Sequence, residues 1–167
     1  MKRVLSAERL RELLHYDSET GFFRWIVKRS GIRRDRNGAA GGPDGNGYLR
    51  IRVDGVFFPA HRLAWLYMTG EMPRGIIDHI DGDIHNNRFN NLRDVTYEFN
   101  NQNKRRATIR SKTGLLGVCA PTASSRKYSA QIGVNGKRVS LGKFETAEDA
   151  HLAYVAAKRR LHEACTI

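Results

Sequence analysis

The stretch IIDHIDGDIHNNRFNNL, residues 76–92, concentrates histidine, aspartate and asparagine more densely than any other part of the chain. Its first isoleucines predict a strand-like start, Gly82 permits a turn, and Phe89 and Leu92 provide apolar anchors before a segment from Tyr97 that we expect to be helical. A strand, a turn and a helix in this order could bring together four polar side chains, those of Asp78, His79, Asn91 and Asn100.

The composition indicates a folded protein with a polyanionic partner. The 167 residues are 40% apolar and 28% charged, as is ordinary for a globular protein. Lys and Arg outnumber Asp and Glu by 29 to 17, which gives a net charge of +12 and favours nucleic acid as the partner. Binding to a membrane surface would call for a basic amphipathic helix or a lipidation motif, and neither is evident.

Other classes of protein receive no support from the sequence. No apolar run approaches the roughly 20 residues that span a bilayer, and the first residues lack the apolar region of a signal peptide, so we expect a cytoplasmic protein. Cys119 and Cys165 lie far apart and form no CxxC pair. We therefore expect reduced thiols, and neither a disulfide framework nor a zinc ribbon.

The sequence before the polar stretch predicts a mixed scaffold. Ser6 can cap a helix that continues to about His15, and Phe22–Val27 is typical of a strand. The glycine- and arginine-rich segment 28–47 is expected to be a cationic surface loop, either solvated or in contact with phosphates.

A hairpin and a helix lead into the polar stretch. Asp54-Gly55 is a two-residue signal for a type I′ turn between strands at Tyr48–Val53 and Val56–Pro59. His61–Thr69 is then expected to form a short apolar helix.

The pattern changes after residue 103. Segment 104–113 is a basic linker in this interpretation, and its cations Lys104, Arg105, Arg106 and Arg110 are candidates for phosphate contacts. From Gly114 the sequence predicts three strands and a helix, with Asn135-Gly136 as a turn. We therefore expect an α+β chain with two domains, residues 1–103 and 114–167.

The polar stretch resembles the HNH endonuclease family, and in particular phage and intron-encoded homing endonucleases. The resemblance rests on Asp78-His79, on NNL at residues 90–92 and on FNN at residues 99–101, and it covers about Phe22 to Lys104. It implies a ββα-metal fold that holds one divalent cation. In this family pattern Asp78 and Asn100 would ligate the metal, His79 would act as general base, and Asn91 would hold the imidazole by its second nitrogen.

Elementary chemistry agrees with these roles. A carboxylate and an amide oxygen are hard ligands that suit Mg²⁺ or Mn²⁺, while a histidine that titrates near neutral pH can activate water. Taken singly, Asn91 and Asn100 could instead be turn or capping residues. His61 is expected to be a helix cap or a buried histidine, and His85 could be a loop residue or a further contact to metal or DNA.

The C-terminal part resembles an AP2 domain, a small three-stranded antiparallel sheet packed on one helix. The resemblance spans about residues 114–163 and is most specific in LGKFETAEDAHLAY, residues 141–154. It implies that the exposed sheet face binds double-stranded DNA in the major groove. Strand alternation leaves three polar residues on that face, Lys127, Gln131 and Arg138. Packing against the nuclease without DNA contact is the alternative.

Together these features predict a sequence-directed, metal-dependent DNA endonuclease. One active site would nick one strand, and a monomer is favoured with a dimer left open; no protein partner is evident. The alternatives are a DNA-binding regulator with a non-cleaving nuclease-like domain, and a non-specific nuclease that acts as a toxin or on RNA. A phage-encoded protein of this type would act in the cytoplasm of a bacterial host.

Overall fold

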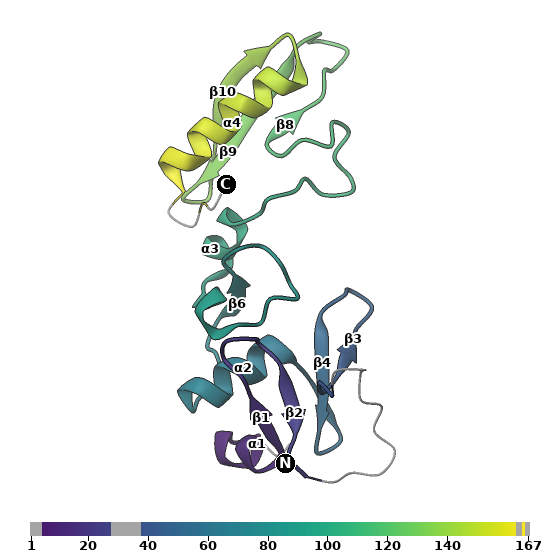
Figure 1. Cartoon of the computed structure of the whole chain (residues 1–167). Helices are drawn as coiled ribbons and strands as arrows, with labels where there is room; N and C mark the ends of the chain where they lie inside the picture. Colours follow the sequence, from purple (N-terminus) through teal and green to yellow (C-terminus); the bar gives the residue numbers. More distant parts are fainter. Residues whose placement is uncertain (1–4, 28–37, 163–164, 166–167) are drawn as a thin grey trace. The chain divides into compact units, whose positions relative to one another are not determined.

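The computed structural model describes residues 5–27, 38–162 and 165, and the chain divides into two compact units, Met1–Tyr97 and Glu98–Ile167 (Figure 1). Both units combine helices with strands, so the expected α+β class is confirmed. The boundary expected at residue 103 falls inside the second unit. Part of the expected cationic loop, residues 28–37, lies outside the described residues.

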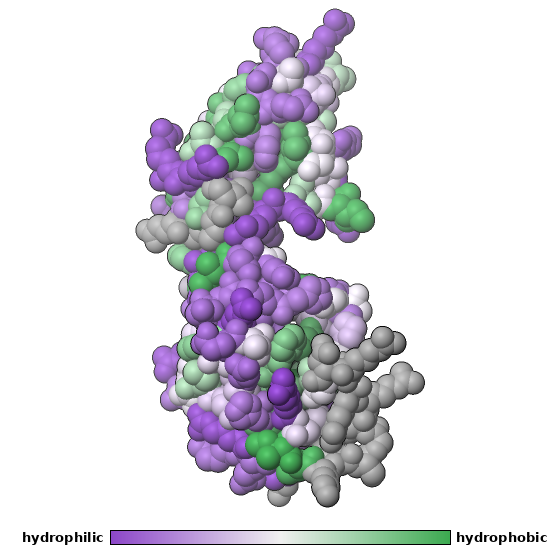
Figure 2. Space-filling view, viewed as in Figure 1, coloured by the Kyte–Doolittle hydropathy of each residue, from purple (hydrophilic) through white to green (hydrophobic). Residues whose placement is uncertain are grey.

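Hydrophilic side chains cover most of the visible face of each unit (Figure 2). Among the described residues, no helix combines the length and the apolar character that a membrane crossing needs.

The first unit begins with a short helix and a two-stranded sheet. The side chain of Ser6 accepts a hydrogen bond from the Arg9 N–H at 3.2 Å and caps α1 (Ala7–Leu13). The helix expected to continue to His15 ends earlier, because residues 14–16 alternate between buried and exposed positions and form a strand. This strand, β1 (Leu14–Tyr16), pairs antiparallel with β2 (Phe23–Trp25).

A three-stranded antiparallel sheet follows, in the order β3 (Gly42–Pro43), β4 (Leu49–Val53) and β5 (Val56–Pro59). The expected hairpin between β4 and β5 is confirmed, since Asp54 and Gly55 have φ angles of 46° and 87°. Positive φ at both central positions is what a type I′ turn requires. The next helix, α2 (Ala60–Thr69), ends at Gly70, which adopts the left-handed conformation at φ 84°.

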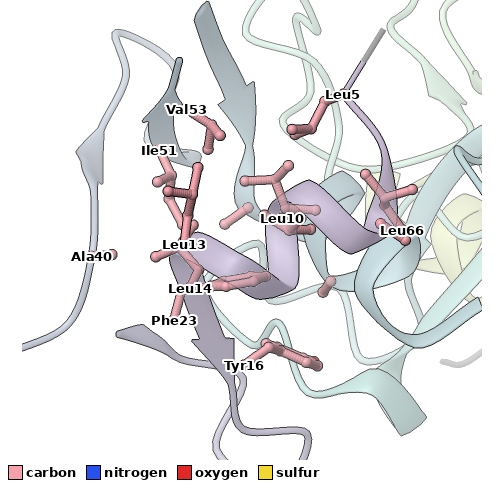
Figure 3. Close-up of a cluster of buried hydrophobic side chains, with 14 of the residues drawn as sticks. Leu5, Leu10, Leu13, Leu14, Tyr16, Phe23, Ala40, Ile51, Val53 and Leu66 are labelled. Carbon is pink, nitrogen blue, oxygen red and sulfur yellow. The ribbon is translucent and has the colours of Figure 1, made fainter. Parts of the chain in front are cut away.

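The core of the first unit lies between α1, α2, the β1–β2 pair and one face of the β3–β4–β5 sheet (Figure 3). Its most deeply buried large side chains are those of Leu10, Leu14, Phe23, Ile51 and Leu63. In β4, Ile51 and Val53 are buried while Arg50 and Arg52 are exposed. The sheet therefore presents one apolar face to the core and one cationic face to solvent.

Two further strands carry the polar stretch. The strand β6 (Ile76–His79) was expected, whereas its antiparallel partner β7 (Leu92–Val95) was not. A single 3-10 turn, η1 (Phe89–Asn91), leads into β7, and the helix expected from Tyr97 is present as α3 (Tyr97–Gln102). The β6–β7 pairing aligns the two ends of the polar stretch.

The second unit contains an antiparallel sheet in the order β10-β9-β8, formed by β8 (Val118–Cys119), β9 (Tyr128–Val134) and β10 (Lys137–Phe144). The helix α4 (Ala147–Leu161) packs against this sheet through two small apolar clusters. One contains Val118, Ala130 and Ala150, and the other contains Ile132, Tyr154 and Ala157. Thr146 caps α4 by accepting a hydrogen bond from the Asp149 N–H at 3.1 Å. Three strands and one helix agree with the sequence, and the AP2 identity of this unit stays a prediction.

The basic segment that follows α3 is attached to this second unit. Lys158 of α4 has only 1% of its surface exposed, and its Nζ donates a hydrogen bond to the backbone carbonyl of Lys104. Burial lowers the pKa of Lys158. The start of the expected linker 104–113 is therefore held by the C-terminal helix.

Candidate active site

The strand β6 places Asp78 and His79 next to each other in the first unit. Both are deeply buried, with 6% and 5% of their surfaces exposed. Successive side chains of a strand point to opposite faces, so these two residues meet different neighbours.

Asp78 lies opposite Arg93 in the β6–β7 register. The Arg93 Nη2 and Nε lie 2.7 and 2.8 Å from Oδ2 of Asp78. A buried carboxylate is costly unless a positive group pairs with it, so the ion pair with Arg93 offsets part of the cost of burying Asp78. Arg93 has no recognisable role in the sequence alone, because its contact with Asp78 depends on the register of the unexpected strand β7.

The ring of His79 is held by an asparagine. Its Nε2 lies 3.1 Å from Oδ1 of Asn87, and Asn87 has only 2% of its surface exposed. With Oδ1 as acceptor, the imidazole donates from Nε2, and the neutral ring then carries its lone pair on Nδ1.

Asn91, which was expected to hold the imidazole, makes different contacts. Its amide nitrogen donates to Oδ1 of Asp81 at 3.0 Å and to the carbonyl of Asn86 at 2.8 Å. Its amide oxygen accepts from the Asp81 N–H at 3.0 Å. Both amide hydrogens of Asn91 are thus committed to closing the loop between β6 and β7, and Asn87 is the residue that meets the ring.

The loop that carries Asn87 is anchored by the N-terminal strands. The Tyr16 hydroxyl of β1 donates to the Asn87 carbonyl at 2.6 Å. Gly21 (φ +76°) allows a further close approach, because a Cβ at this position would lie 2.6 Å from backbone atoms of Asn87 and Arg88. These contacts fix the path of the loop, and with it the position of the Asn87 amide.

Two further rings surround His79. The His61 ring lies 5.4 Å from the His79 ring, edge to face, and the Tyr48 ring lies 5.5 Å from His61 and 6.4 Å from His79. Burial, followed by the nearby His79 and Arg62, lowers the pKa of His61 to about 4. His61 is therefore a neutral packing partner at physiological pH. It does not cap α2, whose N-cap is Pro59.

The second expected metal ligand, Asn100, lies on α3 in the second unit and is half-buried. Throughout the described ranges, no group of three or more His, Cys, Asp or Glu side chains is arranged to hold a metal ion. The expected ligand pair, the Asp78 carboxylate and the Asn100 amide, is smaller than such a group, and both ligands would bind through hard oxygen atoms. His85 is exposed in the β6–β7 loop, where its N–H bonds to Oδ1 of Asp83 at 2.9 Å.

The expected DNA-contacting residues all belong to the second unit. The basic segment exposes all four of its candidates, Lys104, Arg105, Arg106 and Arg110. The β9–β10 register pairs Gln131 with Ser140 and Gly133 with Arg138, which leaves Gln131 and Arg138 on the sheet face away from the α4-facing Ala130 and Ile132.

Two contacts on the second unit bear on this expectation. The Gln131 amide donates to Sγ of Cys119 at 2.8 Å, which fixes the orientation of Gln131 on the sheet. Lys127 precedes β9, and its Nζ lies 2.6 Å from Oε1 of Glu145. Because both partners are largely exposed, this ion pair is weak, and Lys127 is available for exchange with a phosphate.

Comparison with known families gives one finding for this chain. Residues 58–102 match the family model described as HNH endonuclease. The match covers α2, β6, η1, β7 and α3, and therefore contains His79, Asn87 and Asn91. An HNH endonuclease domain implies nuclease activity and DNA binding. Neither the curated proteins nor the solved structures contain a match to the chain.

Proposed function

We propose that this chain is a sequence-directed, divalent-metal-dependent DNA endonuclease of the homing type that nicks one strand per active site. The observation that carries the proposal is the buried His79, whose Nε2 meets Asn87 within the segment that matches the HNH endonucleases.

His79 is the general base in this proposal. A neutral imidazole that donates from Nε2 to Asn87 can take a proton from water at Nδ1. A fixed tautomer matters because only one ring nitrogen can accept this proton. General-base action of this kind contributes about a hundred- to ten-thousandfold to the rate.

The roles of the two asparagines follow from their contacts. Asn87 orients the imidazole directly, while Asn91 closes the loop from which Asn87 projects. The rings of His61 and His79 pack edge to face, which limits rotation of the His79 ring. His61 stays uncharged near neutral pH and so adds no positive charge beside the base.

HNH nucleases generally use a divalent metal ion, and the donor chemistry of this chain fits one. The carboxylate of Asp78 is buried, and its Oδ2 is paired with Arg93. Asp78 and Asn100 would hold Mg²⁺ or Mn²⁺ through oxygen atoms, which such cations prefer. When bound, the cation supplies stabilisation of the negative charge that develops on the leaving oxygen.

The second unit would direct cleavage to a DNA sequence. Gln131 and Arg138 have the hydrogen-bonding groups that recognise adenine and guanine in the major groove. The exposed cations of the segment from Lys104 to Arg110 would contact phosphates, which give affinity without sequence information. An AP2-type reader beside a nuclease would account for both contributions.

The test is cleavage of supercoiled and linear DNA by the purified chain with Mg²⁺, Mn²⁺ or EDTA. The proposal predicts metal-dependent nicking by the wild type and its loss in His79→Ala. DNA binding without cleavage under any metal condition would instead establish the alternative function of a DNA-binding regulator.

A further inference from the structure

The solvent face of the β4–β5 hairpin carries two arginines around one exposed phenylalanine. Arg50 and Arg52 alternate along β4 with the buried Ile51 and Val53, so both point away from the core. Phe57 lies opposite Arg52 in the register, and 52% of its surface is exposed.

Both guanidinium groups lie over the same aromatic ring. The Cζ atoms of Arg50 and Arg52 are 4.4 and 5.6 Å from the centroid of the Phe57 ring. The face of an aromatic ring attracts cations, which offsets part of the repulsion between two like charges. A stacked guanidinium keeps its N–H groups at the edge of its plane, where they can bind a phosphate in a bidentate manner.

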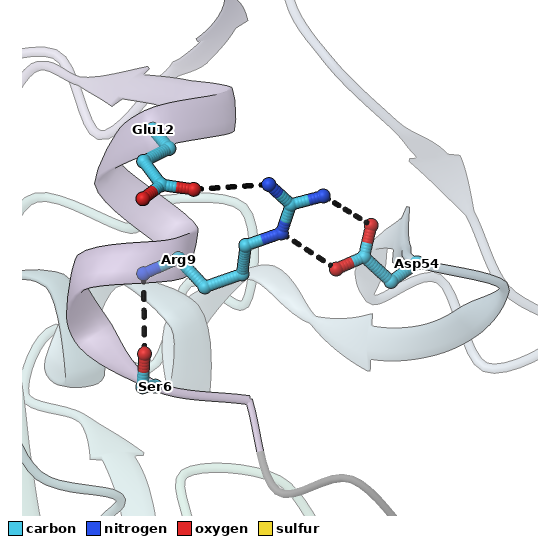
Figure 4. Close-up of polar contacts among 4 residues, drawn as sticks. All are labelled: Ser6, Arg9, Glu12 and Asp54. Carbon is cyan, nitrogen blue, oxygen red and sulfur yellow. Dashed lines mark hydrogen bonds and ion pairs between the residues drawn. The ribbon is translucent and has the colours of Figure 1, made fainter.

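The environment of these arginines differs from that of Arg9 in the same unit. The Arg9 guanidinium is occupied by two carboxylates, with Glu12 and Asp54 both at 2.9 Å (Figure 4). Within the part of the chain that the structure describes, neither Arg50 nor Arg52 forms a salt bridge. The Arg52 Nε donates a hydrogen bond to the Gly55 carbonyl at 3.1 Å, which leaves its two terminal nitrogens for a phosphate. No carboxylate of the described residues therefore neutralises the positive charge of either arginine.

The position of the hairpin connects this surface to the candidate active site. Tyr48, whose ring packs near His79, immediately precedes β4. Since a strand rises about 3.3 Å per residue, Arg50 and Arg52 lie about 7 and 13 Å along the chain from Tyr48. A DNA strand advances about 3.4 Å per nucleotide, so the arginines lie within a few nucleotides of the proposed site of cleavage.

We propose that Arg50, Arg52 and Phe57 form a DNA-contact surface of the nuclease unit itself, and name this surface the β4–β5 arginine face. The inference rests on the proposed function, in which duplex DNA is the substrate. The two guanidiniums bind phosphates of the strand that is cut, and the Phe57 ring packs against a sugar or a base edge. Strands of a β-sheet are among the elements that enter a DNA groove.

The test measures DNA binding by the full chain with His79→Ala as a background, which prevents cleavage during the titration. The affinity for a fluorescently labelled duplex is measured over a series of KCl concentrations for R50Q/R52Q. The matched control, R9Q/R24Q, removes the same charge from exposed positions on α1 and β2, and the melts show whether loss of the Arg9–Asp54 pair disturbs the β4–β5 turn. The variant R50K/R52K keeps the charge and removes the planar stack. Circular dichroism melts confirm that each variant is folded.

The β4–β5 arginine face predicts that R50Q/R52Q raises Kd about tenfold and lowers the slope of log K against log[salt] by about two, one for each lost phosphate contact. R50K/R52K gives an intermediate Kd, and R9Q/R24Q stays close to the background protein. Equal losses in R50Q/R52Q and R9Q/R24Q would overturn the inference and leave the proposed function standing. If the background protein binds no duplex at all, the proposed function fails, and this inference fails with it.

Discussion

Replacing Asn87 by alanine distinguishes the role of Asn87 from that of Asn91 in the candidate site. The change removes the Oδ1 that lies 3.1 Å from Nε2 of His79 and keeps the backbone carbonyl that accepts from Tyr16. Loss of one partner of a buried hydrogen bond costs about 1–3 kcal/mol. If this cost falls on the orientation of the imidazole, the single-turnover rate falls about five- to 150-fold, since 1.36 kcal/mol corresponds to a factor of ten.

The matched variant is Asn91→Ala. It removes three hydrogen bonds that close the β6–β7 loop, so we expect its main effect to be a loss of stability of about 2 kcal/mol or more. Single-turnover nicking of a supercoiled plasmid measures the rate of each variant, and thermal melts measure its stability. A wild-type rate for Asn87→Ala, together with inactivity of a folded Asn91→Ala, would refute the assignment of the imidazole contact to Asn87.

Tyr16→Phe removes only the hydroxyl that anchors the β6–β7 loop, so it should lower both the melting temperature and the nicking rate; an unchanged rate would mean that this anchor does not position the site. Burial lowers the pKa of His61 from 6.5 to about 4, so the unfolded chain binds a proton at this residue before the folded chain does as the pH falls. The free energy of unfolding should therefore decrease between pH 6.5 and pH 4. Melts at several pH values should show a weaker pH dependence for His61→Phe. Mn²⁺ binding, measured by electron paramagnetic resonance, should weaken in Asp78→Asn and in Asn100→Ala. The neighbouring control Asn101→Ala should bind Mn²⁺ as the wild type does. Equal Mn²⁺ binding by all three variants would exclude the proposed ligand pair.

Local signals in the sequence were sufficient for the elements that depend on neighbouring residues. Asp54-Gly55 and Asn135-Gly136 both form the expected tight turns with positive φ. The Ser6 cap of α1 is also as expected, because a cap needs only a hydroxyl and an N–H three residues apart. Residues 14 and 15, which were expected to continue the first helix, belong instead to β1, since tertiary pairing with β2 outweighed a sequence that is compatible with a helix.

The contacts of the candidate site could not be predicted in this way. Asn86, Asn87 and Asn91 are chemically equivalent in the sequence, and which of them meets His79 depends on the path of the loop around Gly21 and Tyr16. The same holds for Arg93, which needs the β6–β7 register to reach Asp78. His61 and Tyr48 approach His79 only because α2 and the start of β4 pack beside β6. Such contacts arise from tertiary structure, and no spacing rule encodes them.

The role of His79 as general base is tested most directly by the single-turnover cleavage rate of His79→Ala, measured with metal ion present and with free imidazole added in increasing concentration. We expect a fall of about a hundred- to ten-thousandfold relative to the wild type, with partial recovery as imidazole supplies the missing base. A His79→Ala protein that cleaves DNA at the wild-type rate without imidazole would show that this residue does not activate water.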